Sequence, residues 1–206
     1  MKKLLLFLLT AYSSCAFAQK SFFGVNAGIN VATQRERFEA SPPATSHNSY
    51  LVYPNVIKPA FGLFYQKGFS GAQDVLAIRV EAKYMGMGYQ QIGPSPFDKS
   101  IEIDYLTFPV SLFYSANKHL SLSAGLYLSF ILGGTEINNQ AITKTYHKND
   151  NGFSFGLEHD VFKNFAMGVN YIIGIKNIIL DDSNGATKYT NRALQFTLIY
   201  KFKKTS

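Results

Sequence analysis

The chain has 206 residues, of which 16% are charged and 15% are aromatic, with 13 Tyr, 18 Phe and no Trp. Ordinary soluble domains carry about 25% charged residues, so this composition argues against a fully solvated surface. The formal net charge is +7, but no basic cluster with interleaved aromatic residues accompanies it. Nucleic acid is therefore excluded as the expected partner.

The N-terminal residues have the three regions of a secretory signal peptide. A basic start, an apolar run and a small-x-small cleavage site follow one another: Met1–Lys3, Leu4–Leu9 and Ala16–Ala18. We therefore predict a signal peptide over residues 1–18, cleaved between Ala18 and Gln19, and one mature domain over residues 19–206. The only cysteine, Cys15, lies inside this segment. Lipidation at Cys15 is the alternative to cleavage after Ala18, and in either case no disulfide framework remains.

Eight segments of the remaining chain alternate apolar and polar residues with a period of two, which indicates β-strands with two different faces. The clearest covers residues 119–132, where leucines alternate with Ser, Gly and Tyr. Each segment is near the 9 to 11 residues that a tilted strand needs to cross a bilayer. The connections between them are alternately long and short. The predicted strands cover residues 22–32, 60–69, 75–88, 101–114, 119–132, 153–162, 165–176 and 191–202.

These features predict an all-β fold, an eight-stranded antiparallel transmembrane β-barrel with short periplasmic turns and long outer loops. The many Tyr and Phe fit the aromatic girdles of such barrels. A soluble lipocalin-like barrel would place the leucines inside instead. The polar face favours the membrane barrel, because it carries Gly, Ser, Asn and Ala rather than the Lys and Glu of a solvated surface. Glu102 and Asp104 share the apolar side of their strand, so we expect them above the membrane or beyond a bulge.

Five charged residues have the parity of the polar face and should therefore point into the lumen. They are Arg79, Glu81, Lys83, Glu158 and Asp160. Buried charges need partners, and an eight-stranded barrel is narrow enough for long side chains to meet across it. We therefore predict a structural charge network that closes the lumen.

Several short motifs resemble the PorT-type outer-membrane β-barrel proteins of Bacteroidetes. The central hairpin of that family resembles Tyr105-Leu-Thr-Phe-Pro-Val-Ser-Leu-Phe-Tyr114, Asn117-Lys118 and Leu122-Ser-Ala-Gly-Leu-Tyr127. Its next hairpin and last strand resemble Phe155-Gly156-Leu157, Lys163-Asn164, Gly168–Tyr171 and Leu198-x-Tyr-x-Phe202. The resemblance implies an outer-membrane barrel and, because founding members assist a secretion system, an envelope- or secretion-related role. The chain departs from the pattern at Phe113, where the family usually has Lys, and by continuing past Phe202.

Catalytic, cofactor and metal sites find little support in the sequence. His47 lies near serines and His147 near Asp150, all in predicted outer loops, but the spacing fixes no nucleophile beside a base. The turn-rich stretch Asp181–Gly185 lacks the acceptor spacing and distant Glu of a calcium loop. We therefore expect no enzyme, no cofactor and no metal.

The expected function is that of a small non-enzymatic outer-membrane barrel with a closed polar lumen. It would contact outer-membrane lipid and bind a partner or ligand, which the sequence does not identify, through its outer loops or periplasmic rim. Three alternatives stay open: a narrow pore, a rim enzyme acting on lipid or peptide, and a soluble lipocalin-like barrel that binds a ligand.

Overall fold

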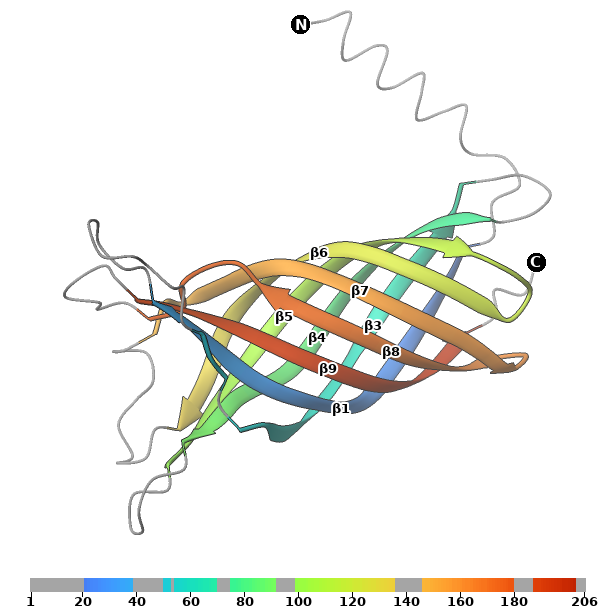
Figure 1. Ribbon diagram of the computed structural model, residues 1–206. Helices are drawn as coiled ribbons and strands as arrows, with labels where there is room; N and C mark the ends of the chain where they lie inside the picture. Colours follow the sequence, from blue (N-terminus) through green and yellow to red (C-terminus); the bar gives the residue numbers. More distant parts are fainter. Residues whose placement is uncertain are drawn as a thin grey trace, which may run out of the picture.

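The structure is a computed structural model that describes residues 21–38, 50–52, 54–69, 75–91, 99–135, 146–179 and 187–202. In these ranges the chain forms nine strands, and eight of them close into an antiparallel barrel (Figure 1). No helix in the described ranges is long and apolar enough to cross a membrane. The strands are β1 Ser21–Phe38, β2 Tyr50–Val52, β3 Val56–Gly68, β4 Leu76–Gln91, β5 Lys99–Ser115, β6 Leu120–Thr135, β7 Asn149–Phe162, β8 Phe165–Gly174 and β9 Thr187–Phe202.

Pairing between the first and last strands closes the barrel. β1 and β9 are antiparallel from Phe23↔Phe202 to Phe38↔Thr187, and the other barrel strands each pair with the next along the chain. This confirms the predicted eight-stranded antiparallel barrel. The short strand β2, which the sequence analysis did not predict, pairs with β1 beyond the barrel's main body. The predicted signal peptide, including Cys15 and Ala18, lies outside the described residues, as do Gln19, His47 and Asp181–Gly185.

The lengths of the connections indicate which end of the barrel faces the periplasm and which faces the outside. The links after β5 and β7 are short and those after β1, β6 and β8 are long, whereas the links after β3 and β4 have the same intermediate length of seven residues. Short turns are typical of the periplasmic end and long loops of the outer end. β1 begins and β9 ends at the end with the short turns, so the chain enters and leaves the barrel at the periplasmic end (Figure 1).

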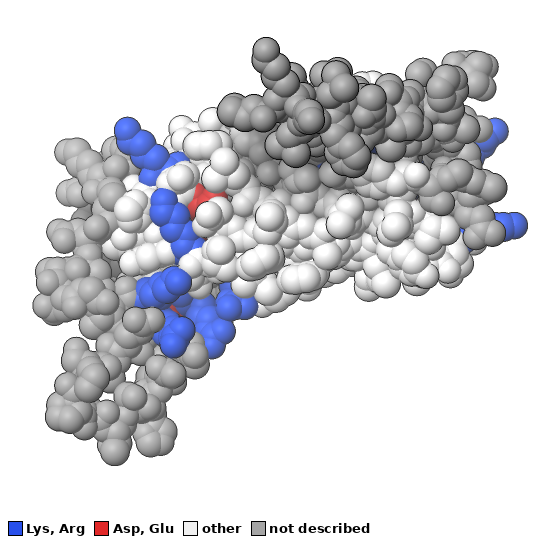
Figure 2. Space-filling view, turned by 90° about the horizontal axis from the view of Figure 1, so that it is seen from above, with Lys and Arg blue, Asp and Glu red and all other residues white. Residues whose placement is uncertain are grey.

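Alternation along each strand separates a lipid face from an interior face. Leu126 and Leu198 point outward and are 59% and 62% exposed, whereas Asn30 and Gln195 point inward and are buried. Aromatic pairs gather near the periplasmic rim, where the rings of Phe23 and Tyr65, and those of Phe165 and Tyr200, lie 4.8 Å apart. In Figure 2 the middle of the visible barrel wall carries almost no charged residue, while Lys and Arg gather toward the outer end.

The two acidic residues on the apolar side of β5 lie at its outer end, as expected from the sequence. Glu102 pairs with Lys58, and Asp104 accepts a hydrogen bond of 2.6 Å from the hydroxyl of Tyr84. The register between β5 and β6 shifts beside Asp104, so Leu132 on β6 has no partner residue opposite it. A bulge of this kind bends the strand and changes the local twist.

A proline interrupts the ladder between β3 and β4. Their pairing ends at Ala60↔Met85, and the next residue of β3, Pro59, has no N–H to donate. The carbonyl of Gly86 instead accepts a hydrogen bond of 3.0 Å from the side-chain amide of Asn30 on β1. A luminal side chain thus satisfies a backbone group that the sheet leaves without a ladder partner.

Candidate functional site

The interior of the barrel has three layers along its axis. A small apolar cluster of Phe22, Phe64, Ala166 and Ile199 lies at the periplasmic end. A charged and polar layer follows, and a larger apolar cluster fills the outer half. The outer cluster includes Met85, Met87, Tyr89, Ile101, Ile103, Tyr105, Tyr146, Ile172 and Ile178. The sequence analysis expected a polar lumen, and the outer half combines this apolar cluster with the buried polar side chains Gln34, Glu36, Asp150 and Asn191.

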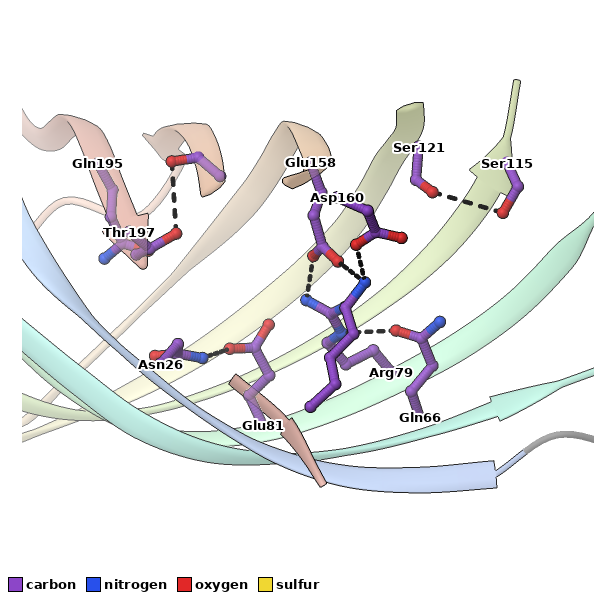
Figure 3. Close-up of polar contacts among 12 residues, drawn as sticks. Asn26, Gln66, Arg79, Glu81, Ser115, Ser121, Glu158, Asp160, Gln195 and Thr197 are labelled. Carbon is purple, nitrogen blue, oxygen red and sulfur yellow. Dashed lines mark hydrogen bonds and ion pairs between the residues drawn. The ribbon is translucent and has the colours of Figure 1, made fainter. Parts of the chain in front are cut away.

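The charged layer is centred on Glu158, which receives a cation from each of two other strands (Figure 3). Its Oε2 lies 2.7 Å from Nη1 of Arg79 on β4, and its Oε1 lies 2.7 Å from Nζ of Lys201 on β9. Lys201 also contacts Asp160, whose side chain is 39% exposed near the periplasmic mouth. Because β4 and β7 are not neighbours in the sheet, the pair of Arg79 and Glu158 crosses the lumen.

Glu81 and Lys83 form a second group further along β4. Lys83 Nζ lies 3.1 Å from Glu81 Oε2 and donates to Gln195 Oε1 at 2.9 Å. Asn26 Nδ2 donates to Glu81 Oε2 at 2.8 Å. Gln195 in turn donates to Asn30 at 2.7 Å, which connects this group to the backbone of Gly86.

The structure thus brings the five predicted residues into two groups rather than one direct network. Arg79, Glu158 and Asp160 belong to the first, although Asp160 joins through Lys201, and Glu81 and Lys83 form the second. The sequence analysis left out Lys201, although its inward parity was a usable signal. With Lys201 included, three cations face three carboxylates, so the described ion pairs of the layer balance in charge.

Two aromatic rings hold the guanidinium of Arg79. Its central carbon lies 4.3 Å from the ring centre of Phe64 and 4.0 Å from that of Phe113. Its Nε donates to Gln66 at 2.8 Å. A cation between two ring faces is stabilised by their quadrupoles. Phe113 therefore has a specific role in packing the buried arginine.

A small polar chamber of about 30 Å³ remains between the charged groups and the opposite wall. Thr107, Ser111, Ser123 and Ser154 line that wall. A chamber of this size accommodates about two water molecules. Among the described residues, Arg79 Nη2 and Asn26 Oδ1 are buried polar atoms without a protein partner, and both residues line the chamber.

Asp150 lies in the apolar half and is held by hydrogen bonds from two luminal side chains. Tyr127 donates its hydroxyl proton to Asp150 Oδ2 at 3.1 Å, and Asn191 donates at 3.0 Å. The sequence analysis placed Asp150 in an outer loop beside His147, which is wrong, because Asp150 is a buried residue of β7. The backbone of His147 instead donates to Ile178, and Tyr146 and Ile178 cover the outer end of the apolar cluster.

The remaining candidate residues do not assemble into a recognised chemical site. His119 and His159 lie at the periplasmic end with ring centres 6.2 Å apart, and both are exposed. Within the described ranges no group of three or more His, Cys, Asp or Glu residues is placed to hold a metal ion.

Comparison with known proteins identifies the family. A family model described as the outer membrane protein beta-barrel domain matches residues 4–202. The chain belongs to this family. It is accordingly a protein of the cell outer membrane, surrounded by outer-membrane lipid.

Solved structures of outer-membrane barrels are similar to the chain at low sequence identity, and AlkL shares the fold. AlkL, determined in lipid bilayers, is 12% identical, with 93% of this chain and 94% of that chain covered and a TM-score of 0.54. Ail, the attachment invasion locus protein of Yersinia pestis, is 12% identical, with 89% and 99% covered and a TM-score of 0.47. Neisserial surface protein A is 13% identical, with 87% and 97% covered and a TM-score of 0.47. No curated protein matches the chain.

Removing Glu158 should destabilise the barrel far more than removing an exposed glutamate of another ion pair. Glu158→Ala leaves the buried Arg79 without its carboxylate partner and Lys201 with Asp160 alone, and breaking a desolvated pair in this way costs about 3 to 5 kcal/mol. Glu102→Ala is the control, because its side chain is 44% exposed and such surface pairs contribute about 0 to 1 kcal/mol. Urea unfolding in lipid vesicles, followed by heat-modifiable gel mobility, measures both variants. Equal losses would show that the luminal ion pair is not stabilising.

Two substitutions of Phe113 should distinguish the loss of ring packing against Arg79 from the effect of an added charge beside it. We expect Phe113→Lys to lower the free energy of unfolding more than Phe113→Leu does. Leucine loses only an aromatic contact of ~0.5 to 2 kcal/mol, whereas lysine adds an unmatched cation beside a buried one, which costs several kcal/mol. The same urea titration ranks the two variants. A lysine variant as stable as the leucine variant would contradict the assigned role of the ring.

Proposed function

We propose that this protein is a non-enzymatic outer-membrane barrel with a closed lumen, which acts by binding a protein or ligand at its outer loops or periplasmic rim. The observation that carries the proposal is the filled interior. Only a chamber of about 30 Å³ remains in the charged layer, and apolar clusters occupy the interior on both sides of it. A hydrated solute would have to break the ion pairs and displace both clusters to pass.

The position of Asp150 supports the non-enzymatic part of the proposal. General-base chemistry needs a carboxylate or histidine within hydrogen-bond reach of a substrate. Asp150 is 2% exposed and its Oδ2 is occupied by Tyr127 and Asn191. With the lumen closed, the surfaces left for function are the two ends, and the long connections lie at the outer one. The resemblance to PorT-type proteins supports an envelope- or secretion-related role.

Conductance in planar lipid bilayers tests the closed lumen. We expect no stable ion-conducting steps from the purified protein. The double variant Arg79→Ala/Glu158→Ala removes an ion pair that crosses the lumen but leaves both apolar clusters in place, so it should also give no stable steps. Lys58→Ala/Glu102→Ala, which removes an ion pair of the outer end, should give none. A large stable conductance from the unaltered protein would overturn the closed lumen and favour the narrow pore.

Site-specific photo-crosslinking in intact cells tests partner binding. A photoreactive residue at Lys148, exposed at the outer end, or at Lys163, in a periplasmic turn, should give adducts of discrete mass. The same residue at Leu126, on the lipid face, should give no protein adduct. Absence of adducts from both end positions, or adducts mainly from Leu126, would contradict binding at the ends.

A further inference from the structure

Basic side chains cluster on the outward face of β1 and β9, near the outer end of the barrel. Arg35 and Arg37 lie on β1, and Lys188 and Arg192 lie on β9. The strands pair Arg37 with Lys188, Arg35 with Thr190, and Thr33 with Arg192. Their sequence neighbours Gln34, Glu36 and Asn191 are buried in the interior, so the basic side chains are directed to the outside.

A hollow lies among these four cations because β8 ends early. β8 stops at Gly174, whereas β9 continues past its partner for Ile173, which is Arg192, to Thr187. The hollow has a volume of about 230 Å³. Its lining residues are Arg35, Arg37, Ile173, Gly174, Ile175, Lys188, Thr190 and Arg192. None of these lining residues is acidic.

A second hollow of about 420 Å³ adjoins the first and shares Arg35 and Arg192 with it. Its wall toward the membrane centre is apolar and includes Val31 and Leu194. The hydroxyl of Tyr171, which also lines it, accepts a hydrogen bond of 3.1 Å from Arg192 Nη1 and so orients the guanidinium. Together the two hollows have cations toward the outer end of the barrel and an apolar surface toward the membrane centre.

The cation nearest the membrane centre, Arg192, lies just beyond the lipid-facing Leu194. Leu194 is exposed on the lipid face, and Arg192 is the next outward-facing residue of β9 toward the outer end. Two residues of strand rise about 7 Å, or about 5 Å along the membrane normal at a tilt of about 45°. The head-group layer extends about 5 to 8 Å beyond the hydrocarbon on each side. With Leu194 at the edge of the hydrocarbon, Arg192 therefore falls within this layer, and Arg35, which is paired with Thr190, lies further out.

We propose that this cleft binds the phosphorylated head group of one lipid of the outer leaflet. The phosphate lies in the first hollow, among Arg35, Lys188 and Arg192, and an acyl chain follows Val31 and Leu194 in the second. Arginine side chains form charge-assisted, often bidentate hydrogen bonds with phosphate oxygens. A lipid has a charged head group next to an apolar chain, and the basic hollow next to the apolar one fits this arrangement better than it fits a soluble anion. This lipid site is separate from the partner binding proposed above and does not depend on the closed lumen.

Titration with a fluorescent lipid tests the proposal on the full chain folded in detergent micelles. The probe is a bisphosphorylated lipid A, compared with the same lipid without phosphates. The triple variant Arg35→Gln/Lys188→Gln/Arg192→Gln should bind the phosphorylated probe at least tenfold more weakly. The control Lys118→Gln/Lys148→Gln/Lys163→Gln removes the same charge from exposed positions elsewhere and should change binding less than twofold. Heat-modifiable gel mobility checks that each variant folds, and Arg192→Gln alone replaces the triple variant if that one does not.

The outcomes separate the lipid from other sources of phosphate. Weak binding of the phosphate-free lipid, together with loss of binding at high salt, would support the site, because exposed charges are screened. Equal binding of both lipids, or an equal loss in the control variant, would overturn it. Displacement of the lipid by an equal concentration of inorganic pyrophosphate would also overturn it, because the site would then recognise a free anion.

Discussion

The structure depends on one requirement of the bilayer, that every backbone N–H and C=O in the hydrocarbon be hydrogen-bonded within the protein. Pairing of β1 with β9 meets this requirement for the sheet as a whole, because a closed barrel has no edge. Pro59 breaks it locally by removing a donor. Asn30 supplies a side-chain donor to Gly86, and its own oxygen accepts from Gln195. A series of hydrogen bonds therefore runs from the carbonyl of Gly86 through Asn30 and Gln195 to Lys83.

Closure also makes the lumen narrow, and narrowness determines what charged residues can do there. A buried charge is tolerated only with a partner, and Glu158 finds cations on two strands that are not adjacent to its own. Glu158 connects β7 to Arg79 on β4 and to Lys201 on β9, so the ion pairs brace opposite walls. The rings of Phe64 and Phe113 then hold Arg79 in place. The same interactions that stabilise the wall also fill the passage through it.

Alternation predicted the fold well because both faces of most strands differ in polarity. It identified which charged residues point inward, but it carries no information about which of them meet. Contacts across the lumen depend on strand tilt and register, so the distribution of Arg79 and Glu81 between two groups was not predictable. Alternation also misleads where the polarity of the two faces reverses, as at Ile103, which points inward between the outward-facing Glu102 and Asp104, and the apolar residues of the outer half were missed for that reason. The polar run after residue 32 concealed that β1 extends to Phe38.

In the extension of β1, successive residues at nearly the same depth face either the lipid or the interior of the barrel. Arg35 faces outward toward the head groups, whereas Glu36 faces inward and accepts a hydrogen bond of 2.6 Å from the hydroxyl of Tyr189. Successive residues of a strand point to opposite faces, so charges adjacent in the chain are separated by the barrel wall. Basic residues at the outer edge can therefore meet lipid phosphate without disturbing the interior. Substitutions of outward-facing residues can therefore alter the surface of the barrel without altering the ion pairs in its lumen.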